Sequence, residues 1–142
     1  MTERKATVTV VSGLTLLPVR RITGYRRDGM AVRMESGAAA EDAGAVPGTA
    51  RAQCGRDDGV FKKQLDYECS GPQESVLARL EGLKAEWLVA VYTDPRGARR
   101  VCGSPAYPLT LDYEESGGKV KVTLTGGDTK PDGYLQPRTG AV

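Results

Sequence analysis

Alternation of apolar and polar residues dominates the chain and predicts a protein built mainly of β-strands. The segments with this pattern are residues 6–11, 30–34, 60–69, 109–114 and 119–124. A period of two is typical of a strand with one buried face and one face in water. Each segment is therefore expected to lie in a sheet that covers an apolar core.

Two segments depart from this alternation. Residues 87–92, WLVAVY, are apolar at every position, which predicts a central strand covered on both faces. Residues 72–84 place four apolar side chains at helical spacing, which predicts one short amphipathic helix that covers a face of that strand. The four side chains are Val76, Leu77, Leu80 and Leu83.

Turn-forming residues join the predicted strands into hairpins. The sequence DPRG at residues 94–97 has proline at its second position and glycine at its fourth, as a type I turn prefers. It should return the chain as an antiparallel strand at residues 98–102. Asp-Gly at residues 28–29 is a strong turn signal, and it predicts a hairpin between residues 19–22 and residues 30–34.

Other parts of the chain show weaker patterns. Residues 35–59 are dense in Gly, Ala and small polar residues, and a stretch this long without periodicity is interpreted as an extended loop. Residues 126–142 are rich in turn formers and are expected to be a flexible end or an arm that docks on a partner. Lys63 interrupts the apolar face of residues 60–69, which places that end of the strand at a sheet margin.

These elements together predict a β-rich α+β fold. We expect an antiparallel sandwich or barrel-like sheet with one short helix and a long Gly/Ala-rich loop. The chain is predicted to be a single domain spanning residues 1–142. Its parts are N-terminal strands at 6–34, the loop at 35–59, a core of one strand, the helix and four strands at 60–125, and a C-terminal arm at 126–142.

Composition argues against most catalytic chemistry. The 142 residues include 20 basic and 18 acidic side chains, for a formal charge of +2, and no histidine. Without histidine, Ser-His and Cys-His nucleophile systems cannot form and the commonest metal ligand is missing. Neither a phosphate-binding glycine loop nor a dinucleotide fingerprint occurs. We therefore expect no enzyme, cofactor or small-molecule substrate, although a fold could bring two carboxylates together for acid–base chemistry.

The cysteines and the N-terminus indicate a cytosolic product. Cys54, Cys69 and Cys102 are odd in number and widely spaced, which favours free thiols over a disulfide framework or a zinc site. Cys54 is predicted to be the most exposed, but it has no neighbour that would activate it. MTERKATVTV lacks the apolar core of a signal peptide, and no run approaches the ~20 apolar residues of a membrane span.

Two sets of charged residues are candidate binding sites. Three arginine pairs could bind phosphates or nucleic acid if the fold brought them together; otherwise they are solvated strand ends. The pairs are Arg20-Arg21, Arg26-Arg27 and Arg99-Arg100. Four acids could be imagined around a metal ion, but they lack the spacing of a cation-binding loop and are interpreted as turn formers. These acids are Asp57, Asp58, Asp128 and Asp132.

The second half of the chain carries a longer pattern. A short helix is followed by an apolar strand ending in TDPRG, then by RRVCGSPAYPLTLDYE and by the hairpin strand VKVTLTGG. This order resembles small proteins encoded in the structural-gene clusters of tailed bacteriophages and prophages. The resemblance implies a virion component of the tail or neck, made in the host cytoplasm, that acts as a ring-forming subunit.

The function expected from this resemblance is structural. The chain is expected to self-assemble into a ring or tube through sheet edges, loop and terminal arms, and to contact other virion proteins. No membrane partner is expected. The alternative is a soluble β-barrel module that binds a small ligand or, through the six arginines named above, nucleic acid.

Overall fold

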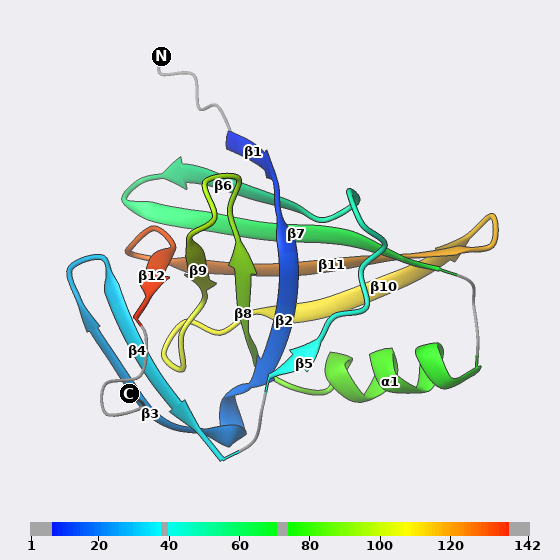
Figure 1. Ribbon diagram of the computed structural model, residues 1–142, viewed down its shortest axis with the longest axis horizontal. Coiled ribbons are helices and arrows are strands. Elements are labelled where there is room, and N and C mark those ends of the chain that lie inside the picture. The colour runs from blue at the N-terminus through cyan, green and yellow to red at the C-terminus, as the bar shows by residue number, and fades with distance from the viewer. Residues whose placement is uncertain (1–6, 38–39, 71–73, 137–142) are drawn as a thin grey trace.

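Two sheets packed face to face form the protein, as the computed structural model shows for residues 7–37, 40–70 and 74–136 (Figure 1). The first sheet has five strands in the order β1 (Thr7–Val10), β6 (Arg51–Asp57), β7 (Val60–Ser70), β11 (Lys119–Asp128) and β10 (Thr110–Ser116). All of its neighbouring strands are antiparallel. We call it sheet A.

The second sheet, sheet B, has seven strands. Their order is β3 (Ile22–Asp28), β4 (Ala31–Ser36), β12 (Gly133–Leu135), β9 (Arg99–Cys102), β8 (Leu88–Thr93), β2 (Ser12–Pro18) and β5 (Glu41–Asp42). Only the β12–β4 pair is parallel among these strands. A 3-10 turn, η1 (Val19–Arg21), and one α-helix, α1 (Glu74–Lys84), complete the described elements. The predicted β-rich α+β sandwich with one short helix is confirmed.

The main core lies between the two sheets. Sheet A contributes Leu65, Tyr67, Cys69, Leu111, Val120, Val122 and Leu124, and sheet B contributes Leu14, Leu16, Leu88, Ala90, Tyr92 and Cys102. Helix α1 packs beside β10 and adds Leu80 and Leu83. In Figure 1 strands β6, β7, β11 and β10 of sheet A cross β2, β8 and β9 steeply, as in an orthogonal sandwich.

Strand β8 is buried on both faces, as its unbroken apolar run predicts. Leu88, Val89 and Ala90 have no exposed surface. Sheet A, rather than the helix alone, covers one face, and the β3–β4 hairpin covers the other. That second core contains Val32, Val89, Val91 and Val101, with Val19, Ile22, Tyr25, Met34 and Leu135 against it. The predicted turn also forms, because the Gly97 N–H donates to the Asp94 carbonyl at 2.9 Å and β9 returns antiparallel.

The first hairpin starts later than predicted. Val19–Arg21 forms the turn η1, whose Val19 N–H donates to the Trp87 carbonyl at 2.8 Å. Strand β3 then runs from Ile22 to Asp28 and pairs with β4. Residues 23–27 were not predicted to be a strand, but Tyr25 packs inward on the second core, so alternation continues through them.

The prediction of an extended loop at residues 35–59 is wrong in part, because strands occupy residues 35–36, 41–42 and 51–57 and, within the described part, only residues 43–50 form a longer stretch without strand or helix. Strand β5 pairs with β2, and β6 pairs with both β1 and β7. Asp58 and Gly59 have φ of 51° and 78°, as the two central residues of a type I′ hairpin turn require. Strand β6 packs the small side chain of Ala52 against the core. It has no large apolar residues on that face, so its sequence does not show the alternation that identifies a strand.

The prediction of a free C-terminal arm is also wrong for the described part of residues 126–142. Strand β11 continues to Asp128, and β12 fits between β4 and β9. A Cβ on Gly133 would lie 2.4 Å from Val32 Cγ2, so only glycine allows β12 to approach β4 this closely. Predicted segments at residues 1–6, 38–39, 72–73 and 137–142 fall outside the described residues.

Candidate functional site

A buried ionic cluster lies in the core at Lys63. Its Nζ is 3.1 Å from Asp132 Oδ1 and 3.7 Å from Asp128 Oδ2, and the lysine side chain is only 2% exposed. The Tyr92 hydroxyl donates a hydrogen bond to Asp132. The prediction that Lys63 marks a sheet margin is therefore wrong, since β7 is the middle strand of sheet A. Two carboxylates from the C-terminal segment make the buried ammonium tolerable.

This cluster anchors the segment that leads into β12. Burial, with the charge of Asp132, raises the pKa of Tyr92 far above its usual range, so its hydroxyl stays a donor at neutral pH. Burial also raises the pKa of Cys102 well above that of an ordinary thiol. Arg100 donates to the carbonyl oxygens of Asp132 and Gly133 at 2.6 and 3.3 Å. These contacts fix the segment that leads into β12.

The acids considered for a metal site and interpreted as turn formers lie in two places. Asp128 and Asp132 meet at Lys63, whereas Asp58 lies in the β6–β7 turn. Within residues 7–37, 40–70 and 74–136, no group of three or more His, Cys, Asp or Glu side chains is arranged to hold a metal ion. Cys54, on β6, is half-buried and pairs across the sheet with Lys63 of β7. Burial raises the pKa of its thiol, which makes Cys54 a poor nucleophile.

One member of each arginine pair has a local partner. Arg20 forms an ion pair with Glu86 at 2.7 Å, Arg27 donates to the Gly29 carbonyl at 2.8 Å, and Arg100 holds the β12 segment as described above. Arg27 lies six residues beyond Arg21 along the chain, about 20 Å in an extended strand. The pairs at η1 and at the far end of β3 are therefore not one basic surface.

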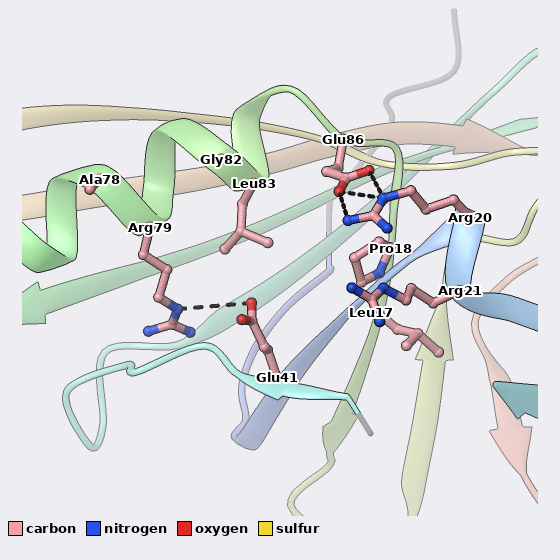
Figure 2. A pocket seen from close by; sticks show the side chains of 10 residues that line it. All are labelled: Leu17, Pro18, Arg20, Arg21, Glu41, Ala78, Arg79, Gly82, Leu83 and Glu86. Carbon is pink, nitrogen blue, oxygen red and sulfur yellow. Dashed lines mark hydrogen bonds and ion pairs between the residues drawn. The ribbon is translucent and has the colours of Figure 1, made fainter. Parts of the chain in front are cut away.

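A hollow of about 410 Å³ lies between η1, β5 and α1. Figure 2 shows Arg20 facing Glu86 and Arg79 facing Glu41 across it. The hydrogen bond from Arg20 lowers the pKa of Glu86, and Arg79 also donates to the Asp42 carbonyl. These contacts tie α1 to the neighbouring strands, and they leave the hollow with largely compensated charge.

Three of the four sheet edges are protected against pairing with another chain. At β10, Leu109 exchanges both backbone hydrogen bonds with Leu88, and the Asp112 carboxylate accepts the Tyr113 N–H at 3.0 Å. Strand β5 is two residues long, and Arg79 occupies its Asp42 carbonyl. Strand β3 has a register shift after Ile22 and carries charged side chains. Short length, charges and bulges are common defences of edge strands.

The remaining edge, β1, is also short, at four residues, but its described residues pair with β6 without a bulge. Its sequence TVTV has no charged residue, and Val8 and Val10 are 54% and 51% exposed. The Val11 N–H donates to the Ala50 carbonyl at 3.0 Å, toward β6. Because N–H groups alternate in direction along a strand, those of Val8 and Val10 point away from β6, off the open edge. The sequence shows this strand, but not that it lies at an edge.

Comparison with known protein families, curated proteins and solved structures found no match to this chain. In the part of the chain that the structure describes, no helix is long and apolar enough to cross a membrane. The open edge at β1 and the outer face of sheet A, treated below, are consequently interpreted from their own geometry and chemistry.

Proposed function

We propose that this chain is a non-enzymatic structural subunit of a virion, in the tail or neck, that assembles with its own copies into a ring or tube. The observation that carries the proposal is the unprotected edge strand β1, with Val8 and Val10 exposed beside unpaired backbone groups. The resemblance of the second half to small phage structural proteins supports the class of protein.

A strand from a neighbouring copy placed beside β1 would extend sheet A. Its backbone would pair with the outward N–H groups of Val8 and Val10 and cover their side chains, as in β-augmentation. Pairing of β1 with the β1 of a second copy uses the same edge on both chains, so it gives a dimer and cannot continue into a larger assembly. A ring or tube requires β1 to meet a different surface of the next copy.

The edge is a better candidate contact than the loop or the C-terminal arm. In the C-terminal segment, residues 126–128 and 133–135 belong to β11 and β12, and in the predicted loop, residues 41–42 and 51–57 belong to β5 and β6. Main-chain pairing at β1 needs no rearrangement of either segment. Assembly is therefore proposed to proceed through β1 with the rest of the sandwich unchanged.

Light scattering coupled to size-exclusion chromatography, with negative-stain microscopy, tests this proposal. The unaltered chain is expected to form a multi-subunit species of fixed size. Val8→Pro removes an outward N–H without touching a β1–β6 hydrogen bond and should give monomers with unchanged circular dichroism. Val8→Thr, which keeps the N–H and the branched shape, should still assemble. A chain that is monomeric at about 100 μM, some 100-fold above a micromolar Kd, contradicts the proposal.

A further inference from the structure

The outer face of sheet A carries a continuous row of side chains. Strand registers place Gln53, Gln64, Thr125 and Thr110 side by side from β6 to β10. An antiparallel bridge between Leu88 and Leu109 then sets Trp87 opposite Thr110, because both residues neighbour the bridged pair. The row thus crosses four strands and ends at a tryptophan.

The polar side chains in this row and the next are held in place by one another. Gln64 Nε2 donates to both oxygens of Asp66, at 3.1 and 2.9 Å. Thr123 Oγ1 donates to Asp66 Oδ1 at 3.0 Å, and Gln53 Nε2 lies 3.5 Å from Asp66 Oδ2. Because the Gln64 amide donates to Asp66, its carbonyl oxygen remains for another donor. The Asp66 carboxylate therefore fixes the orientation of Gln64, Gln53 and Thr123.

The same face is hollowed. Two adjoining hollows, of about 720 and 740 Å³, share Gln53, Gln64, Thr110 and Thr125 in their linings. In the neighbouring row, Gly55 and Gly127 are the cross-strand neighbours of Lys62. Because glycine has no side chain, the surface of the sheet is depressed on both sides of that lysine. A Cβ added at Gly55 would meet no described atom within 4 Å. Missing side chains, as well as sheet shape, make this space.

Trp87 lines the first hollow and is 60% exposed. It is the only tryptophan in the chain, and the apolar run that it begins is otherwise buried along β8. A large aromatic ring left open beside a polar hollow offers a flat surface with an N–H at its edge. Such a ring is suited to a flat ligand that is apolar on its face and polar around its rim.

The charges on this face oppose a polyanionic ligand. Over the two hollows together, basic residues are matched by acidic ones, so no excess of positive charge develops: Arg51, Lys62, Lys63 and Lys121 against Asp66, Glu68, Asp112 and Glu114. Nucleic acid would require that excess. A lipid surface would require a broad apolar patch, whereas amides, hydroxyls and carboxylates form much of this lining.

We propose that the outer face of sheet A binds a neutral oligosaccharide. One sugar ring stacks on Trp87, and hydroxyl groups of this and the next sugar hydrogen-bond to Gln64, Gln53 and the threonines of the row. Sugar hydroxyls both donate and accept, which matches this mixture of amides and hydroxyls. Pairing along β1 would bring a neighbouring copy close to Val8, which lines the second hollow, but it would leave Trp87 and the row from Gln53 to Thr110 open, so a sugar could bind with or without assembly.

Intrinsic fluorescence reports on the site directly, since Trp87 is the only tryptophan. The purified chain is titrated with cellohexaose, xylohexaose, chitohexaose and maltohexaose, each up to about 10 mM to capture millimolar affinities. At least one sugar is expected to give a saturable blue shift. Amide NMR shifts with that sugar should be confined to β6, β7, β10, β11 and the residues next to Trp87.

Variants separate the site from the fold. Trp87→Ala should weaken binding by at least about tenfold, measured by NMR because the fluorophore is lost. Gly55→Val, whose Cβ would meet no described atom within 4 Å, places bulk in the hollow and should do the same. Tyr134→Ala removes an exposed aromatic ring from sheet B and should leave binding unchanged, with thermal unfolding monitored for all three.

Two results would overturn the proposal. One is the absence of a saturable change with all four sugars over this range. The other is binding that survives both Trp87→Ala and Gly55→Val, which would place the sugar elsewhere. Either result leaves the test of assembly untouched, because that test reads particle size and not ligand binding.

Discussion

Lys63 shows how a single side chain connects distant parts of this chain. It lies on the apolar face of β7, 3% exposed, and its partners Asp128 and Asp132 come from the other end of the sequence. Tyr92, on β8, donates to the same Asp132. One buried ion-paired group therefore links sheet A, sheet B and the segment before β12.

Replacing Lys63 with methionine is expected to lower the free energy of unfolding by about 3–5 kcal/mol, because two buried carboxylates lose their counter-charge. Urea denaturation measures the change. Lys121→Met, at an exposed position of β11, is the matched control and should shift stability by less than about 0.5 kcal/mol. Equal effects of the two substitutions would show that the ionic cluster contributes little.

At the scale of elements, local patterns reveal β8 and its turn but not β6 or β12. Strand β8 needs only its own apolar run to be recognised, and residues 94–97 contain the whole turn signal. Strand β6 presents Ala52 to the core, too small to mark an apolar face. Strand β12 has three residues, and its parallel pairing with β4 depends on segments about a hundred residues apart, which no local period records.

The same limit applies to the candidate sites. Trp87 belongs to an apolar run, so the sequence pattern alone assigns it to the core. In the structure β8 begins at Leu88, one residue after Trp87, and the tryptophan is 60% exposed. Lys63 was visible as an exception, but its carboxylate partners depend on the C-terminal segment returning through the core. The open edge at β1 depends on the order of strands in sheet A, which is a property of the whole fold.

The turn of the β6–β7 hairpin is expected to need glycine at residue 59. Gly59 has φ of 78°, a conformation that costs a residue with a Cβ about 1–2 kcal/mol, so Gly59→Ala is expected to lower stability by about that amount. Gly82→Ala, in α1 with no described atom within 4 Å of the added Cβ, should instead stabilise by up to about 1 kcal/mol. Thermal unfolding of both variants measures the contrast. A stabilising Gly59→Ala would contradict a type I′ turn.

At the scale of the whole molecule, β8 belongs to both cores. Its Leu88 and Ala90 side chains pack between the sheets, whereas Val89 and Val91 pack under the β3–β4 hairpin. Neither core can lose its contacts without exposing one face of this strand. Both should therefore unfold together, as single domains of this size usually do.

This coupling predicts one cooperative transition in urea. Trp87 fluorescence, which reports on the outer face of sheet A, and far-ultraviolet circular dichroism, which averages over all strands, should give the same midpoint. Gly133→Ala, which pushes a Cβ to within 2.4 Å of Val32 Cγ2 in the second core, should lower both midpoints equally. Amide exchange should be slowest in β8 and faster in β1, where one side of the strand is open. A fluorescence midpoint that stays fixed while the dichroism midpoint falls would show that the hairpin detaches alone, and that the two cores are separate units.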